Sequence, residues 1–272
     1  MLQDISGQFD NQYKSLIPGT GDVAVCFKDG QVLLHRDENG TLQFPCYDSP
    51  APGRYLFRLA DRNWFLWEAD PTPLEKGFSW EPVRQLRQLQ SKDICFGIMT
   101  AWHLYNWYEN NRYCGKCATP ICHDEVQRML KCPKCGNVIF PRISPAVIIA
   151  VTRGEHLLLS KYAGRAYTRY ALLAGFTEIG ETPEQTVARE VMEEVGLRVK
   201  NIRYYKSQPW GVDGNLLLGF YCDLDGDDTI RLDETELAMA EFYPRNALPA
   251  KDDGISLTRE MIRIFEEGKE PK

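Results

Sequence analysis

Residues 172–197 read LLAGFTEIGETPEQTVAREVMEEVGL and combine helix-boundary signals with an unusual density of glutamates. Thr182 is a suitable N-cap, the proline after it suits the first helical position, and Gln185 completes a capping box. Gly196 is a natural helix terminator. Together these signals predict a helix over 183–195.

The glutamates of this predicted helix are too close together for an ordinary surface. At roughly 100° per residue, Glu190, Glu193 and Glu194 fall within one arc, so their carboxylates should point in one defined direction, and Glu194 is expected at a surface-facing position. Three carboxylates on about one turn raise each other's pKa values unless cations compensate. Hard divalent cations such as Mg²⁺ or Mn²⁺ prefer such ligands, whereas a merely solvated acidic face would normally be mixed with lysine. The apolar residues that fix the helix to a core fall on another arc: Val187, Ala188, Val191, Met192 and Val195.

Two C-x-x-C pairs, CGKC at 114–117 and CPKC at 132–135, are separated by fourteen residues. Two thiolate pairs on tight turns can complete a tetrahedral Zn²⁺ site, so the spacing predicts a zinc ribbon. Cys122 and His123 lie between the pairs and could substitute, although four cysteines already fill such a site. A ribbon either contacts nucleic acid or is a structural staple, and the lack of an interleaved aromatic platform favours the staple. The predicted zinc ligands are Cys114, Cys117, Cys132 and Cys135.

The composition is that of a folded protein, with 43% apolar and 26% charged residues in a chain of 272. A net charge of −6 argues against general affinity for polyanions. No run of eighteen apolar residues predicts a membrane span, and the first ten residues lack the pattern of a signal peptide, so no membrane association is expected. Nine cysteines, four of them in C-x-x-C pairs, indicate a reducing compartment, and we expect the cytoplasm.

Three domains are expected along the chain. Short apolar or alternating runs separated by turns predict a β-rich N-terminal domain over 1–110, which ends in helices. Within it, the run EPVRQLRQLQ predicts a helix that starts behind Pro82. The zinc ribbon occupies 111–140, and a mixed α/β domain occupies 141–272.

From Gly175 onward, the sequence fits the pattern G-x5-E-x7-R-E-U-x-E-E-x-G-U, in which U is a bulky apolar residue. Every fixed position is filled, by Gly175, Glu181, Arg189, Glu190, Val191, Glu193, Glu194, Gly196 and Leu197. The stretch therefore resembles the signature of the Nudix hydrolases. This resemblance implies an α/β (α+β) fold, an α/β/α sandwich with a mixed sheet. It also implies metal-dependent hydrolysis of a nucleoside diphosphate linked to another group.

The same resemblance implies roles for individual residues. Metal ions in such a site neutralise a pyrophosphate and lower the pKa of a bound water. The implied catalytic residues are Arg189, Glu190, Glu193 and Glu194, with Arg189 orienting a glutamate. The implied ligands of Mg²⁺ or Mn²⁺ are the carbonyl of Ala174 and the carboxylates of Glu190, Glu194 and Glu236.

The order of zinc ribbon, Nudix signature and the tetrapeptide SQPW at 207–210 resembles the NAD(H) diphosphatase branch of that family, the NADH pyrophosphatases. Members of this branch cleave the pyrophosphate of NADH or NAD⁺ to nicotinamide mononucleotide and AMP. Some also remove NAD caps from RNA, and members are commonly homodimers. The substrate-binding residues that this resemblance implies are Arg84, Phe140, Phe176, Gln208, Pro209, Trp210 and Asn215.

The loop after SQPW departs from the branch, which typically continues with PFPxS where this chain has GVDGN at 211–215. Glycines and an acid replace prolines and an aromatic residue, so we expect a flexible, polar loop in place of a stiff, apolar one. Two alternatives therefore stay open. The substrate could be ADP-ribose or another dinucleotide. The chain could instead be a zinc-ribbon nucleic-acid-binding or regulatory protein with an inactive Nudix domain, which its intact glutamate set argues against.

Overall fold

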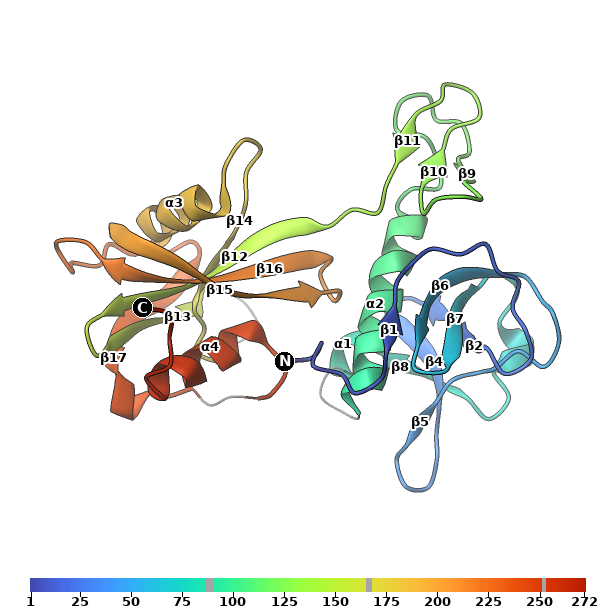
Figure 1. Ribbon diagram of the computed structural model, residues 1–272, viewed down its shortest axis with the longest axis horizontal. Helices are drawn as coiled ribbons and strands as arrows, with labels where there is room; N and C mark the ends of the chain where they lie inside the picture. The colour runs from blue at the N-terminus through green and yellow to red at the C-terminus, as the bar shows by residue number, and fades with distance from the viewer. Residues whose placement is uncertain (87–90, 165–167, 251–252) are drawn as a thin grey trace. The chain divides into compact units, whose positions relative to one another are not determined.

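The computed structural model describes residues 1–86, 91–164, 168–250 and 253–272, and the chain forms two compact units (Figure 1). The C-terminal unit consists of Met1, residues 143–210 and residues 215–272. The N-terminal unit consists of residues 2–142 and 211–214. In the part of the chain described, no helix combines the length and apolarity needed to cross a membrane.

The C-terminal unit is built on one six-stranded mixed sheet. Its strand order is β15-β16-β12-β13-β17, with β14 paired to β12. β12 and β16 are parallel and the other pairs are antiparallel. The strands are β12 (Ser144–Arg153), β13 (His156–Tyr162), β14 (Leu173–Phe176), β15 (Val199–Trp210), β16 (Asn215–Leu224) and β17 (Leu237–Pro244), and a short 3₁₀ helix, η2 (Arg245–Ala247), follows the last.

Two helices cover opposite faces of this sheet (Figure 1). Because side chains alternate along a strand, β12 sends Val147 and Ile149 into the core beneath α3 (Pro183–Val195). Ile148 and Ala150 point to the other face, into the core beneath α4 (Leu257–Glu266). A strand buried on both faces reads as a continuous apolar run, which SPAVIIAV provides. The expected α/β/α sandwich with a mixed sheet is confirmed.

Helix α3 begins and ends at the predicted residues. The Thr182 hydroxyl accepts from the Gln185 backbone N–H, and the Gln185 side chain accepts from the Thr182 N–H, so the capping box is present. Gly196 ends the helix with φ +69°, a left-handed conformation that glycine adopts without strain. The expectation that Glu194 faces the surface is wrong, because its side chain is only 2% exposed. Glu194 follows Val187 by seven residues and is rotated from it by only about 20°, so it lies at the edge of the buried stripe.

The N-terminal unit contains two small β-sheets. The first has the order β1-β6-β7-β2 and the second the order β3-β4-β5, with β8 paired to β4. Aromatic side chains from the first sheet, such as Phe57, Trp64 and Phe65, are buried in the core of this unit. The strands are β1 (Phe9–Asp10), β2 (Val23–Val25), β3 (Phe27–Lys28), β4 (Gln31–Arg36), β5 (Leu42–Gln43), β6 (Gly53–Leu59), β7 (Arg62–Trp67) and β8 (Ser79–Pro82).

The helices of this unit are η1 (Thr72–Leu74), α1 (Val83–Leu86) and α2 (Lys92–Glu109). α1 starts behind Pro82 as predicted; the rest of that expected helix, residues 87–90, lies outside the described residues. The Ser91 hydroxyl caps α2 by accepting from the Ile94 N–H. Gly97 lets α2 approach the first sheet, because a Cβ at that position would lie 2.5 Å from the ring of Trp64.

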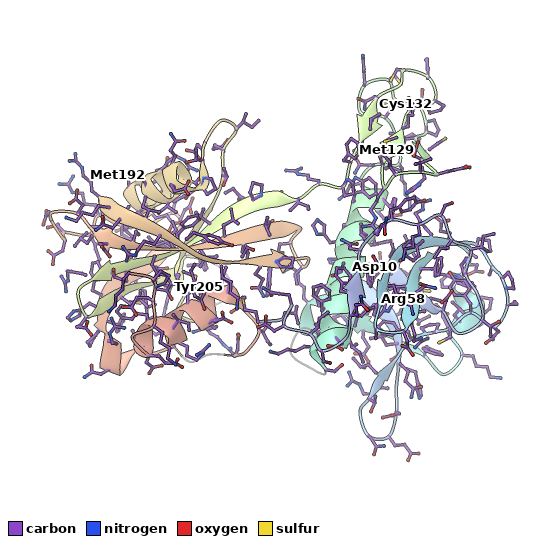
Figure 2. All side chains as sticks on the ribbon, in the orientation of Figure 1. Asp10, Arg58, Met129, Cys132, Met192 and Tyr205 are labelled. Carbon is purple, nitrogen blue, oxygen red and sulfur yellow. The ribbon has the colours of Figure 1, made fainter. Side chains whose placement is uncertain are left out.

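A small module follows α2 in the same unit. It has a three-stranded sheet of order β11-β10-β9, formed by β9 (Cys122–His123), β10 (Leu130–Lys131) and β11 (Val138–Ile139). Figure 2 labels Met129 and Cys132 in this module. Cys132 is buried although the module is small.

The segment 211–214 belongs to the N-terminal unit and is packed against it. Val212 is buried, and a Cβ at Gly211 would lie 2.2 Å from the carbonyl oxygen of Met99. Asp213 forms an ion pair of 2.6 Å with Arg84. The packing therefore opposes the expected flexibility of this loop, although its polar character remains: the glycines allow close approach of backbone to α2, and the exposed acid has a cationic partner.

Candidate active site and metal centre

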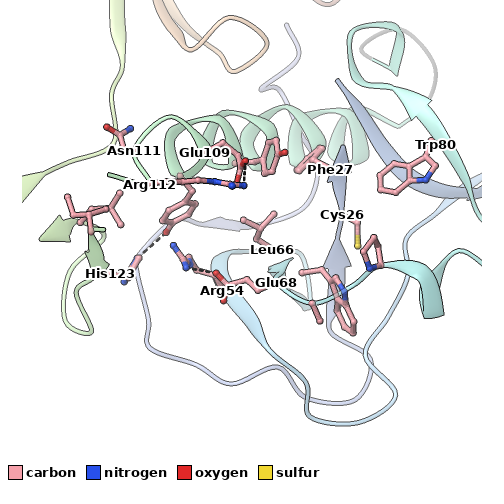
Figure 3. A pocket seen from close by; sticks show the side chains of 17 residues that line it. Cys26, Phe27, Arg54, Leu66, Glu68, Trp80, Glu109, Asn111, Arg112 and His123 are labelled. Carbon is pink, nitrogen blue, oxygen red and sulfur yellow. Dashed lines mark hydrogen bonds and ion pairs between the residues drawn. The ribbon is translucent and has the colours of Figure 1, made fainter. Parts of the chain in front are cut away.

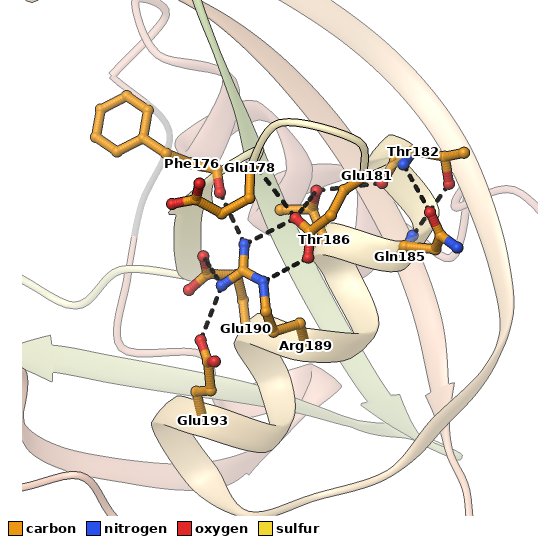
Figure 4. Close-up of polar contacts among 9 residues, drawn as sticks. All are labelled: Phe176, Glu178, Glu181, Thr182, Gln185, Thr186, Arg189, Glu190 and Glu193. Carbon is orange, nitrogen blue, oxygen red and sulfur yellow. Dashed lines mark hydrogen bonds and ion pairs between the residues drawn. The ribbon is translucent and has the colours of Figure 1, made fainter.

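Arg189 on α3 organises a cluster of glutamates (Figure 4). Its Nε and Nη2 donate to the two carboxylate oxygens of Glu181, at 2.7 and 3.0 Å. Its Nη1 donates to Glu190 and to Glu193, at 2.8 Å each. The Nη2 also donates to the carbonyl of Phe176, at 2.9 Å. All five guanidinium N–H groups therefore have acceptors, which fixes the positions of three carboxylates and of the loop carbonyl.

Glu181 is the strongest partner of Arg189. From the sequence it was only one fixed position of the Nudix signature, with no role of its own. Its second oxygen also accepts from the Thr186 hydroxyl, at 3.0 Å, and from the Glu178 backbone N–H, at 3.1 Å. Thr186 is fully buried, so its hydroxyl is a fixed donor. The fixed spacing between Glu181 and Arg189 in the sequence pattern could have indicated this pairing. The chain passes through a short loop and about two helical turns between them, which places Arg189 within reach of Glu181.

Glu190 sits in a half-buried position directly beside the glycine loop. A Cβ at Gly175 would lie 1.8 Å from the carboxyl carbon of Glu190, so the glycine supplies the space that this carboxylate occupies. Burial raises the pKa of Glu190, Arg189 opposes the rise, and the charges of Glu193 and Glu236 add to it. Glu236 directly precedes β17, and its charge is among those that raise the pKa of Glu190.

This arrangement fits a hard cation. Arg189 offsets one of the three negative charges that it binds, and the charge of Glu236 also acts on Glu190. Ala174 lies beside Gly175 on β14, where residues 173–176 pair with β12. Carboxylate and carbonyl oxygens are the donors that hard divalent cations prefer. The residues that would hold such an ion are therefore Ala174, Glu190, Glu194 and Glu236, which stay predictions for this chain.

Gly175→Ala should lower hydrolytic activity while leaving the fold intact. The new methyl group displaces the end of a side chain rather than backbone, so the free energy of unfolding should fall by only about 1–3 kcal/mol, the usual cost of overpacking. The Glu190 carboxylate must move by more than 1 Å, and such a misplacement of a catalytic group costs about 10²-fold in rate. Thermal unfolding and steady-state turnover of the purified variant measure the two effects. Equal activity of variant and native protein would contradict the role given to this glycine.

The pair of Glu181 and Arg189 should make stability depend on pH. Hydrogen bonds from Arg189 lower the pKa of Glu181 to about 2, from 4.5 for an unperturbed carboxyl group. A depressed pKa contributes stability that is present above the unfolded value and is lost as pH falls toward the folded value. We therefore expect Glu181→Gln to have a lower Tm than native protein at pH 7 and the difference to vanish between pH 4.5 and 2. A difference that stays constant over that range would show that the pair's charge is irrelevant.

The second cluster lies in the small module of the N-terminal unit. The sulfur atoms of Cys114, Cys117, Cys132 and Cys135 all lie within 4.8 Å of one another, and three of the separations are 3.5–3.6 Å. Four thiolates at 2.3 Å from a tetrahedral ion would be about 3.8 Å apart. Cys117 bonds to the Thr119 hydroxyl, at 3.4 Å, which helps to lower the pKa of Cys117 to about 6. The four cysteines therefore fit a structural metal site. His123 instead contacts Tyr108, at 3.0 Å.

The predicted substrate-binding residues are distributed over both units. Gln208 is fully buried: its Nε2 donates to the Ile255 carbonyl and its Oε1 accepts from the Leu257 N–H, so its side chain secures the start of α4. Phe176 and Phe140 are more than half exposed, as a ring that stacks on a ligand must be before binding. Phe140 and Arg84 belong to the N-terminal unit. Pro209 is exposed, Trp210 and Asn215 are half-buried and paired across β15 and β16, and Arg84 binds Asp213. Contact of these residues with a substrate stays a prediction.

The sandwich and its arginine-bound carboxylates define a class, the metal-dependent hydrolases of phosphoric anhydrides. Residues 142–264 match the NUDIX domain. The NAD-capped RNA hydrolase NudC of Chromobacterium violaceum is 36% identical over 239 residues, 88% of this chain and 89% of the relative. The protein of the same name from Pseudomonas aeruginosa is 32% identical over 280 residues, 96% of this chain and 95% of the relative. A crystal structure of a NUDIX hydrolase from Nitrosomonas europaea, 23% identical, superposes with a TM-score of 0.49 and covers 57% of this chain and 91% of its own.

The chain therefore belongs to the Nudix hydrolase family, in the branch represented by these NudC relatives. It is an enzyme that acts on pyrophosphate bonds, and the predicted alternative of a binding protein with an inactive Nudix domain is set aside. The family uses divalent metals, for which the α3 cluster has the donors. The four cysteines are a second group whose geometry could hold a metal ion.

Proposed function

We propose that this enzyme hydrolyses the pyrophosphate bond of NADH and NAD⁺ to nicotinamide mononucleotide and AMP, and that it also removes NAD from the 5′ end of RNA. The observation that carries the proposal is the complete Arg189 cluster within a chain that aligns with NAD-capped RNA hydrolases over 88% and 96% of its length. Neither the fold nor the cluster alone selects a dinucleotide, since the same site can act on other diphosphates.

The proposed ion at α3 is Mg²⁺ or Mn²⁺, and the proposed ion at the cysteines is Zn²⁺. When bound, the α3 ion would neutralise the pyrophosphate and lower the pKa of an attacking water. Arg189 holds Glu190 and Glu193 in place for that purpose, and Gly175 leaves room for Glu190. Burial of Glu194 limits its motion. We propose that the substrate is bound by the following residues: Arg84, Phe140, Phe176, Gln208, Pro209, Trp210 and Asn215.

We propose that the chain has three domains, over 1–110, 111–140 and 141–272. We also propose that it assembles as a homodimer. Nine cysteines that form no disulfide, two of them exposed, support a reducing compartment, and we propose the cytoplasm.

The test is a comparison of substrates at equal concentration. The protein is incubated with Mg²⁺ or Mn²⁺ and with NADH, NAD⁺, NAD-capped RNA, ADP-ribose or a diadenosine polyphosphate, and the products are separated by chromatography. We expect nicotinamide mononucleotide and AMP from NADH and NAD⁺, with kcat/KM at least about tenfold above that for ADP-ribose, a difference of about 1.4 kcal/mol in transition-state binding. A preference for ADP-ribose would support the alternative substrate and overturn the proposal.

A further inference from the structure

The N-terminal unit contains a cavity of about 470 Å³ that the Nudix chemistry does not use (Figure 3). Its walls come from both small sheets, from α2 and from the cysteine-bearing module. The volume lies within the range of small-molecule binding sites.

One end of the cavity is aromatic and apolar. Figure 3 shows Cys26, Phe27 and Trp80 together at this end. Phe27 is buried and packs against Tyr105, which also lines the cavity, with ring centroids 5.1 Å apart. The indole N–H of Trp80 donates to Glu75, at 3.1 Å, which sets the orientation of its ring. Oriented rings of this kind bind a flat π system by stacking.

The other end is polar but carries no net charge. Arg54 pairs with Glu68, and Arg112 pairs with Glu109. The guanidinium of Arg54 also lies 4.3 Å from the ring centroid of Tyr108. Burial and the charge of Arg54 lower the pKa of His123, which favours its uncharged form. The two ion pairs cancel, so the cavity offers hydrogen-bond donors and acceptors without the positive charge that a phosphate requires.

We propose that this cavity binds an uncharged nucleoside, with its base at the end of Phe27 and Trp80 and its sugar hydroxyls at the end of Arg54 and Glu68. The base contributes the planar ring that stacking needs. The hydroxyls can donate to the carboxylate of Glu68 and accept from the guanidinium of Arg54. These bonds to the ligand would replace part of the ion pair between Arg54 and Glu68. The site lies wholly within the N-terminal unit and is independent of the proposed hydrolytic activity.

The test uses adenosine and the full-length chain, with no divalent cation added. Isothermal titration calorimetry should show saturable binding with a sub-millimolar Kd, and the Tm should rise with adenosine concentration as binding to the folded state requires. Trp80→Leu keeps an apolar side chain but removes the stacking surface, so it should weaken binding about 10-fold or more, the scale of a base–aromatic stack. Glu68→Gln keeps the shape of the polar end and should weaken binding by a smaller factor, about 3- to 10-fold.

Glu190→Gln is the matched control, since it changes the other unit, and it should bind adenosine as native protein does. Three results would overturn the proposal: no saturable binding up to about 5 mM adenosine, a limit well above any specific Kd expected for a ligand of this size; equal binding by native protein and both cavity variants; or loss of binding in Glu190→Gln. Should Trp80→Leu fail to fold, Glu68→Gln, a change at an exposed position, still decides the outcome.

Discussion

Glu190→Gln should lower the turnover of a pyrophosphate substrate by about 10²–10³-fold, the scale of removing one electrostatic stabiliser from an active site. Gln has the shape of Glu and can still accept from Arg189, but it removes one of the charges that would hold a cation. Stability should not fall. Burial raises the pKa of Glu190, so the ionised group is less stable in the folded chain than in the unfolded one, and a neutral side chain removes that cost.

Glu184→Gln is the matched control on the same helix. Glu184 lies in the first turn of α3 and is exposed, outside the Arg189 cluster. Its turnover should stay within about twofold of the native value, and its stability should change by no more than about 0.5 kcal/mol through the helix dipole. If the turnover of Glu190→Gln were comparable with that of this control, Glu190 would have no role in the active site.

Cys132→Ser should abolish stoichiometric zinc binding and unfold the module that carries the cysteines. Cys132 is buried among the four sulfurs, and a serine hydroxyl is a poor ligand for Zn²⁺. The module's sheet has three strands of two residues each, too little buried surface to fold without the metal. Metal analysis should give no retained zinc after dialysis, and hydrogen exchange should show loss of protection at the amides of β10.

Cys122→Ser provides the control for this loss. Cys122 is exposed, lies on β9 of the same module and is not one of the four clustered cysteines. Its variant should keep the native zinc content and the native protection from exchange. Equal zinc content in Cys132→Ser and native protein would contradict the assignment of the cysteine cluster.

Features decided by local interactions could be predicted from the sequence. The limits of α3 follow from Thr182, Gln185 and Gly196, which act within a few residues of the helix ends. The sulfur cluster follows from its spacing, because each C-x-x-C pair lies on one turn. The sandwich was implied by the resemblance to the Nudix signature.

Features that depend on distant partners could not be predicted. Gln208 bonds to backbone 47 and 49 residues away, so its SQPW motif gave no indication that it secures α4. The glycines of 211–214 suggested a flexible loop, because the sequence does not show that Gly211 packs against the backbone of Met99. Glu194 lies where the acidic and apolar arcs of α3 meet, and only the packed sheet decides which arc it joins. The cavity beside Arg54 and Trp80 assembles segments from across the N-terminal unit, and no motif marks it.

We infer that the carboxylates of α3 hold the divalent cation on which hydrolysis depends. Binding of Mn²⁺ measured by electron paramagnetic resonance tests it without reference to activity, because the signal of free Mn²⁺ falls as the ion binds. We predict that native protein and Glu184→Gln remove Mn²⁺ from solution with the same affinity and that Glu190→Gln binds at least about tenfold more weakly, as loss of a charged oxygen ligand requires. Equal Mn²⁺ affinity of Glu190→Gln and native protein would contradict the account.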